Sequence, residues 1–249
     1  MLYRNRADEG TVTATAQLSA LPAGFLQQTH LAKVWRTATG TTTATLRVDL
    51  GAAVACSCLA LAGLNLSATG TVRVTASNVS ATGTELYDST ALTGCDPEYR
   101  LYVRAFASVE ARYWQVVISD PSLSYLEAGR IILGELWVPT VGYQFGLTDN
   151  IRRTASVTVS DGGQSWSDIK HDRRVMTPTF PAINKTDKEA RFAEIRRYGA
   201  RTRDVLFVPN TESTNLSRDS LWAELETDIQ FRRDRFDIFN MPLTLAERL

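Results

Sequence analysis

The chain has 249 residues with 27 basic and 27 acidic side chains, so its formal net charge at pH 7 is zero. A protein that binds nucleic acid through the phosphates normally carries a basic excess, and the totals show none. The hydrophobic fraction of 44% is ordinary for a soluble globular protein. The length is sufficient for one large or two modest domains, each with its own core.

The cysteines and the apolar stretches indicate the cellular compartment in which the protein assembles. Cys56, Cys58 and Cys95 are an odd number and a poor framework for disulfides. The N-terminus has no apolar run followed by a small-residue cleavage site, so we expect no secretory signal and assembly in a reducing cytoplasm. The longest apolar stretch, residues 52–66, is interrupted by polar residues and glycine. It is shorter than the roughly 20 residues of a membrane helix, so we expect no membrane insertion.

The composition changes near residue 140. Residues 1–140 hold 10 basic and 11 acidic side chains, whereas residues 141–249 hold 17 and 16. The first part is rich in threonine, alanine, serine, valine and leucine, and the second is densely charged. This shift predicts two domains, residues 1–140 and residues 141–249.

The first domain is predicted to be an antiparallel β-sandwich. Apolar and polar residues alternate over short segments separated by glycines, with little helical periodicity. Strands at this spacing are typical of sandwiches. The predicted strands are residues 41–50, 53–61, 71–77, 99–105, 113–119 and 129–138.

The second domain is predicted to be a β-barrel or sandwich with one α-helix. The turn signal Asp161-Gly162-Gly163 separates its first two strands. Thr186, followed three residues later by Glu189, forms a capping box that predicts a helix over residues 187–198. The predicted strands are residues 153–159, 166–180, 204–208, 221–231 and 235–245.

One segment of the first domain resembles a known class. Residues 111–139 read ARYWQVVISDPSLSYLEAGRIILGELWVP. They resemble a segment near the end of galactose-binding-like, or discoidin-like, sandwich domains in phage tail proteins. In that pattern an Arg-Tyr-Trp strand is followed by an acidic turn and a Gly-Arg-Ile-x-Leu-Gly strand. Residues 34–36 and 46–67 resemble the front half of the same domain. The resemblance implies a jelly-roll sandwich over residues 20–140.

Residues 141–249 resemble the split-barrel domain of tail-tube and distal tail proteins, in the order of elements and in the ending FRRDRFDIFNMPLTLAERL. The resemblance implies a structural subunit of a siphophage tail tip, located in the virion. Such a subunit forms a ring, by analogy a hexamer. The ring connects the tail tube protein to tip and hub proteins, and DNA is only passing cargo.

The stretch 210–219 (NTESTNLSRD) is long and polar. In the resemblance it corresponds to a loop that reaches a neighbouring subunit, which makes Asn210, Glu212, Arg218 and Asp219 candidate ring-interface residues. The alternative is a solvated surface loop, because most loops of this composition only face solvent.

The sequence predicts no enzyme. The only histidines are His30 and His171, and no nucleophile elbow accompanies them. Neither a phosphate-binding glycine loop nor a calcium loop is present, so we expect no cofactor and no metal. Cys56 and Cys58 lie on one face of a predicted strand. A zinc site would need two more ligands, and two small core residues are the favoured interpretation.

Carbohydrate binding is the alternative function. Sandwiches of this class often bind sugars at one end through loop aromatics and polar groups, and Trp35, Arg36 and Asn65 are candidate glycan contacts. The protein would then be an adhesin of the tail tip that contacts a glycan on the host surface. Trp35 precedes an alternating strand, however, and could equally pack in the core. A glycan-cleaving enzyme is a third hypothesis.

Overall fold

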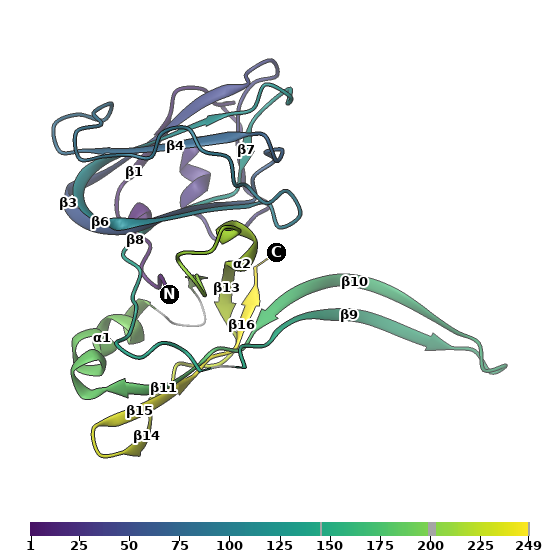
Figure 1. Ribbon diagram of the computed structural model, residues 1–249. Coiled ribbons are helices and arrows are strands. Elements are labelled where there is room, and N and C mark those ends of the chain that lie inside the picture. The colour runs from purple at the N-terminus through teal and green to yellow at the C-terminus, as the bar shows by residue number, and fades with distance from the viewer. Residues whose placement is uncertain (145, 199–202, 249) are drawn as a thin grey trace. The chain divides into compact units, whose positions relative to one another are not determined.

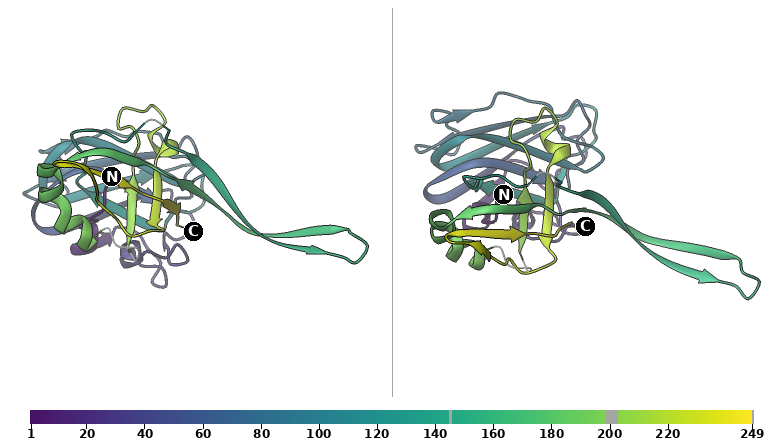
Figure 2. Two further views of the ribbon diagram at one scale, coloured as in Figure 1. Left: turned by 90° about the horizontal axis from the view of Figure 1, so that it is seen from below. Right: turned by 60° about the horizontal axis from the view of Figure 1, so that its bottom comes forward.

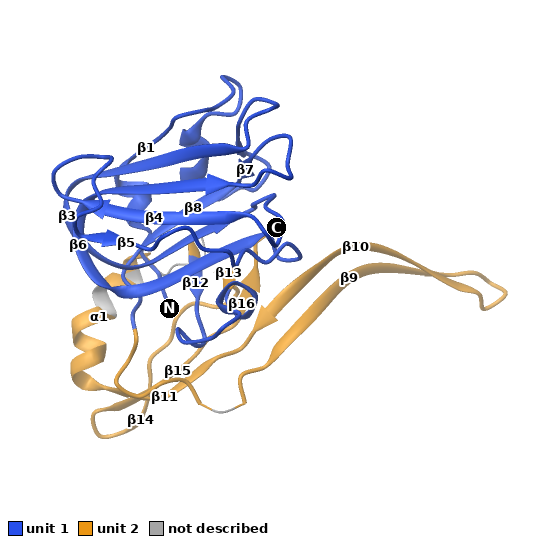
Figure 3. Ribbon diagram, turned by 45° about the horizontal axis from the view of Figure 1, so that its top comes forward, with its two compact units in different colours: residues 1–137, 205–220 blue, residues 138–204, 221–249 orange. Residues whose placement is uncertain are grey.

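The computed structural model describes residues 1–144, 146–198 and 203–248. The chain forms two compact units. Unit 1 comprises Met1–Trp137 and Val205–Ser220, and unit 2 comprises Val138–Asp204 and Leu221–Leu249 (Figure 3). Residues 205–220 therefore belong with the N-terminal part of the chain, although they lie within the C-terminal half of the sequence. No helix among the described residues is long and apolar enough to cross a membrane.

Unit 1 is an antiparallel β structure, as the alternating pattern predicts. A short helical turn, η1 (Arg6–Glu9), precedes the first strand, and a second, η2 (Ala23–Gln27), follows it. The short helix α2 (Leu216–Asp219) lies in the returning segment, residues 205–220. The strands are β1 (Thr11–Ala14), β2 (Trp35–Arg36), β3 (Thr43–Ala62), β4 (Thr71–Ser77), β5 (Tyr87–Asp88), β6 (Leu101–Ser119), β7 (Glu127–Ala128), β8 (Arg130–Gly134) and β12 (Asp204–Phe207), of which Asp204 belongs to unit 2.

Two strands of unit 1 are longer than the sequence pattern indicates. The segments predicted as separate strands at 41–50 and 53–61 form the single strand β3, and those at 99–105 and 113–119 join in β6. The pairing of β3 with β6 shifts register between Asp49 and Val54, next to Gly51, whose φ is +76°. Such irregularities bend a strand without ending it. Figure 1 shows β3 and β6 curving together.

Because of the bend, the two halves of each long strand belong to different layers of unit 1. The first half of β3 pairs with β1 and the end of β6, whereas the second half pairs with β8 and the start of β6. Leu46 and Val48 from the first half lie in the same buried cluster as Leu59 and Leu61 from the second. Trp114 on β6 is fully buried in this cluster. One pair of bent strands therefore encloses the core of unit 1.

The returning segment of unit 1 covers a strand edge. The backbone N–H of Val103 on β6 donates to Ser217 Oγ at 3.0 Å, and Ser217 Oγ donates to the carbonyl of Gly94 at 2.5 Å. A residue of β12, Leu206, forms a bridge with Leu2. Uncovered strand edges are sites of unwanted pairing, so α2 closes part of the β6 edge.

Unit 2 consists of open sheets and one long helix, α1 (Lys185–Tyr198). Its strands β13, β16, β10 and β9 are hydrogen-bonded neighbours in that order, and β11, β15 and β14 form a second sheet. The strands are β9 (Asp149–Val159), β10 (Ser165–Met176), β11 (Thr179–Asn184), β13 (Leu221–Leu225), β14 (Arg232–Arg235), β15 (Ile238–Pro242) and β16 (Leu245–Glu247).

The mainly β class with antiparallel sheets and one long helix is confirmed. The expected barrel is wrong for the described part of unit 2, because the strands form separate open sheets. One reason is that β9 and β10 run on as a hairpin beyond the short strand β16, which pairs with β10 only at Val175 and Met176. The predicted turn is present at the tip of this hairpin, where Gly163 has a φ of +78°.

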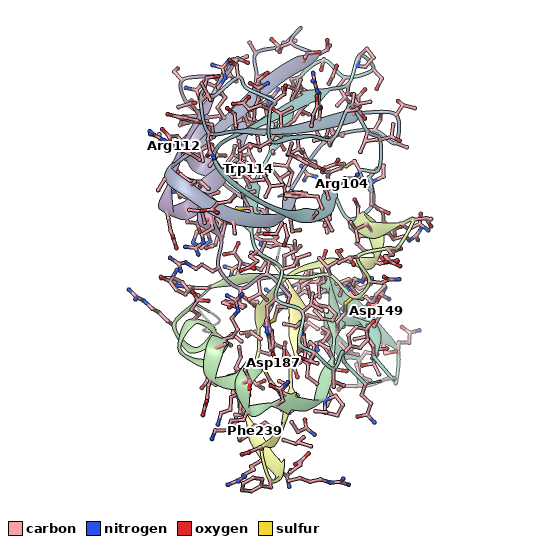
Figure 4. All side chains as sticks on the ribbon, turned by 60° about the vertical axis from the view of Figure 1, so that its left-hand side comes forward. Arg104, Arg112, Trp114, Asp149, Asp187 and Phe239 are labelled. Atoms are coloured by element: carbon pink, nitrogen blue, oxygen red, sulfur yellow. The ribbon has the colours of Figure 1, made fainter. Side chains whose placement is uncertain are left out.

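The start of α1 differs from the prediction. The helix begins at Lys185, and the Oδ1 of Asn184 accepts a hydrogen bond from the backbone N–H of Asp187 at 2.7 Å. Asn184 is therefore the N-cap, and Thr186 lies inside the first turn. The Asp187 carboxylate in turn accepts hydrogen bonds from the Asn184 amide and the Thr140 backbone N–H. Figure 4 labels Asp187 at this end of the helix.

We expect Asn184→Ala to lower the free energy of unfolding by about 1 kcal/mol, since the substitution removes the N-cap. Thr186→Ala is the matched control and should have a smaller effect, because Thr186 does not occupy the cap position. Urea denaturation of both variants measures the difference. A larger loss of stability for Thr186→Ala would show that Thr186, and not Asn184, caps the helix.

We expect Ser217→Ala to lower the free energy of unfolding by about 1–3 kcal/mol, because the buried N–H of Val103 and the carbonyl of Gly94 lose their shared partner. Thr214→Ala, at an exposed position of the same segment, should change it by less than about 0.5 kcal/mol. Hydrogen exchange at Val103 provides a second readout. Unchanged protection of this amide in Ser217→Ala would contradict the assignment of Ser217 as its partner.

Candidate functional site

The most exposed feature of unit 2 is the hairpin formed by β9 and β10. All eleven residues of β9 are exposed, as are the first eight of β10. Figure 2 shows the hairpin extending beyond the other strands of its unit. An isolated two-stranded hairpin is at best marginally stable in water, so a hairpin of this length requires an explanation.

The distal half of the hairpin is amphipathic. Residues directly opposite each other in an antiparallel pair lie on the same face, and the register pairs Val159 with Ser165, Val157 with Ser167 and Ala155 with Ile169. Val157, Val159 and Ile169 are 65%, 61% and 51% exposed. We call this side the apolar face, defined by Ala155, Val157, Val159 and Ile169.

The opposite side, the hydroxyl face, consists of Thr154, Ser156, Thr158 and Asp168 together with Trp166 near the tip. The register pairs Thr158 with Trp166 and Ser156 with Asp168. Asp168 is its acidic member, His171 lies opposite Thr154 on the same side, and Lys170 sits at the register shift between Ile169 and His171. The two faces therefore differ in chemistry although both are open to solvent.

Charged residues gather at the base of the hairpin. Arg153 pairs with Asp172 across the two strands at 3.0 Å, and the largely buried Arg174 pairs with Asp149 at 2.5 Å. The Glu247 carboxylate accepts the backbone N–H of Arg174. Burial raises the pKa of Glu247 above its usual range. These contacts anchor the base, and the charged residues of the distal half are Asp161, Asp168 and Lys170.

The edges of the distal half are unpaired within the described chain. β9 is the last strand of its sheet, and the only strand beside β10 other than β9 is β16, at the base. Unpaired backbone groups along an edge are a template for another strand. The hairpin thus offers two open edges and an apolar face.

The candidate glycan residues lie around one short strand pair. Trp35 is 0% exposed, and its Nε1 donates to the carbonyl of Ala16. Its ring packs in the core, as the alternative interpretation held, and has no surface for a sugar. The Arg36 guanidinium lies 3.6 Å from the centre of the Tyr125 ring, and the Asn65 amide donates to the Tyr125 carbonyl. The structure therefore brings Arg36 and Asn65 together at Tyr125, without Trp35.

The candidate interface residues of the stretch 210–219 make contacts within unit 1. Asn210 Oδ1 accepts the backbone N–H of Glu212, and the Asp219 carboxylate accepts Ser213 Oγ. Arg218 forms an ion pair with Glu98 at 3.4 Å. The segment that carries them lines a pocket of about 270 Å³ together with residues of the 92–96 loop and of β6. Sequence patterns gave no signal for this pocket, because its walls are far apart in the chain.

The groups considered for catalysis or metal binding are scattered. His30 and His171 are exposed, and the described residues contain no group of three or more metal-ligating side chains. The three cysteines are buried and free, and burial raises the pKa of each thiol to about 12. A register shift between Cys56 and Cys58 breaks the alternation of β3. Cys56 and Cys95 belong to the hydrophobic cluster of unit 1, whereas Cys58 does not.

Comparisons with known proteins concern about half of the chain. No family model matches, and no curated protein matches. A fucosidase from Ruminococcus gnavus is similar over 54% of this chain and 27% of its own, with 12% identity and a TM-score of 0.47. This chain thus matches little more than a quarter of that enzyme.

Two binding modules are similar over nearly their whole length. The module CpGH89CBM32-5 from Clostridium perfringens, solved with GalNAc-β-1,3-galactose, has 13% identity and a TM-score of 0.45, and the match covers 52% of this chain and 97% of that one. A chitosan-binding module from Paenibacillus has 20% identity and a TM-score of 0.42, over 52% of this chain and 98% of that one. The TM-scores are below 0.5, so the fold assignment rests on the strand pairing described above.

Proposed function

We propose that the protein is a structural subunit that assembles with copies of itself into a closed ring through the β9–β10 hairpin. The observation that carries the proposal is the distal half of this hairpin, which exposes an apolar face and two unpaired edges. The ring supplies what the isolated chain lacks, namely strands beside the hairpin and a surface over its apolar face.

The energetics favour burial of the hairpin. Covering a valine or isoleucine side chain is worth about 1.5–3 kcal/mol relative to full exposure. Val157, Val159 and Ile169 are each more than half exposed. Pairing of one edge with the other edge of a neighbouring hairpin is a head-to-tail contact, which closes into a ring when the rotation permits. The same contact satisfies the backbone groups of both edges.

The finer proposal is a distal-tail-like ring subunit of a siphophage tail tip, located in the virion. It rests on the sequence resemblances of residues 111–139 and 141–249, to which the open edges of unit 2 lend support. The tail tube protein and the tip or hub proteins would be its partners.

Self-assembly predicts a difference between the two faces of the hairpin. In the full chain, the double substitution Val157→Lys and Ile169→Lys should reduce assembly strongly, because it places charges on a face that becomes buried. Thr158→Lys is the matched control on the hydroxyl face and should still assemble. Light scattering after gel filtration over a concentration series, with electron microscopy of the products, measures the effect.

Since all three positions are exposed, the free energy of unfolding of the monomer should change by less than about 0.5 kcal/mol in each variant. Wild-type protein that stays monomeric at every concentration would overturn the proposal. Equal loss of assembly in both variants would overturn the assignment of the apolar face as the buried one.

Carbohydrate recognition by unit 1 is the second candidate function, in which the protein acts as an adhesin that contacts a host surface glycan. The observation in its favour is the pocket beside the stretch 210–219, whose walls are rich in hydroxyl groups. Both proposals are non-catalytic.

A further inference from the structure

The pocket of unit 1 lies where the returning segment meets the sandwich. Its walls come from the 92–96 loop, residues 102–105 of β6 and residues 211–218. A volume of about 270 Å³ is just below the range of pockets for drug-sized ligands. It therefore suits a small molecule or a single residue of a polymer.

Two side chains that line the pocket contain polar atoms without partners. The hydroxyl of Tyr102 and the Nε of Arg104 are buried, and neither makes a hydrogen bond within the protein. Tyr102 is only 2% exposed. The register pairs Tyr102 with Leu61 and Arg104 with Leu59, so both side chains lie on the core-facing side of β6. Figure 4 labels Arg104 on this strand.

The unpaired groups are all able to donate. An arginine Nε has no acceptor capacity. Burial raises the pKa of Tyr102 to about 12, so its hydroxyl keeps its proton at neutral pH. A third buried hydroxyl without a partner, that of Tyr87, interacts electrostatically with Tyr102. Leaving such groups unsatisfied is costly, and an acceptor that enters the pocket would remove this cost.

The two arginines that line the pocket differ in their ionic partners. Arg218 pairs with Glu98, whereas Arg104 has no ion pair with any described carboxylate. Asp96 is the one acid in the lining, and its Oδ1 accepts the backbone N–H groups of Glu98 and Tyr99. The guanidinium of Arg104 is therefore the charge that a ligand would neutralise.

The remaining walls are polar and uncharged. Hydroxyl or amide side chains of the returning segment line the pocket opposite β6, and they are Thr211, Ser213, Thr214, Asn215 and Ser217. Such groups both donate and accept hydrogen bonds and match the hydroxyls of a polyol.

We propose that this pocket binds a hydroxylated carboxylate, with its carboxylate on Arg104 and Tyr102 and its hydroxyls against the 211–217 side. Arginine is suited to carboxylates because its donors match their geometry. Two sources have this chemistry, an acidic sugar residue of a glycan and a free hydroxy acid. The inference deepens the second candidate function and is independent of ring assembly.

The test is calorimetric titration of the full chain with glucuronate, citrate and glucose. We expect glucuronate or citrate to bind, and Arg104→Met to weaken that binding by about tenfold or more, since a charged hydrogen bond is lost. Tyr102→Phe should weaken it without lowering the melting temperature, because it removes only a hydroxyl that has no partner in the protein. Arg73→Met, at an arginine already paired with Asp88, is the control and should bind as the wild type does.

The three ligands distinguish the possible outcomes. Binding of glucuronate points to an acidic sugar as the natural source, and binding of citrate alone to a free hydroxy acid. Glucose binding as tightly as glucuronate would overturn the role of Arg104 but leave carbohydrate recognition standing. No binding of either acid, or acid binding that survives both Arg104→Met and Tyr102→Phe, would overturn the inference.

Discussion

Backbone groups at the edges of β-sheets need partners, and the two units of this chain meet that need differently. In unit 1 the edge of β6 receives the hydroxyl of Ser217 from a segment more than 100 residues away in the sequence. In unit 2 the distal edges of β9 and β10 receive nothing from the described chain. An edge that the chain leaves open on a long hairpin is either a liability or an interface.

The distribution of side chains on the hairpin favours an interface. Charged residues are a common protection against edge-to-edge pairing, yet here they concentrate at the base, in the pairs Arg153–Asp172 and Arg174–Asp149. In the distal half, Val157, Val159 and Ile169 share one face with two serines, whereas the other face carries hydroxyl side chains with Trp166 and Asp168. This is the pattern of a strand pair with one buried face. Within the described structure that face is exposed, and our proposal assigns its cover to a neighbouring copy of the chain.

The docked segment 205–220 has a second consequence in unit 1. By covering the edge of β6 it supplies the polar wall of a pocket whose other wall includes Tyr102 and Arg104. Neither wall would form a site alone. The pocket therefore depends on the same contact that closes the edge.

The sequence by itself determined the mainly β class, the hairpin turn at residues 161–163 and the presence of a helix near residues 187–198. These features follow from local alternation, turn residues and capping signals, which act over a few neighbours. It did not determine that β3 and β6 are continuous, because a bend made by register shifts looks in sequence like two strands. The choice of Asn184 over Thr186 as N-cap was also open, since both residue types cap helices well.

Only the tertiary structure decided what covers each apolar face. Alternation in β9 and in β4 is similar in the sequence, yet β4 is buried in the core and β9 is exposed along its length. Trp35 is buried and the pocket at Arg104 exists because residues distant in the chain lie against them. A local pattern records which side of a strand is apolar. The partner of that side is set by contacts between distant segments, and these are not encoded in any short window of residues.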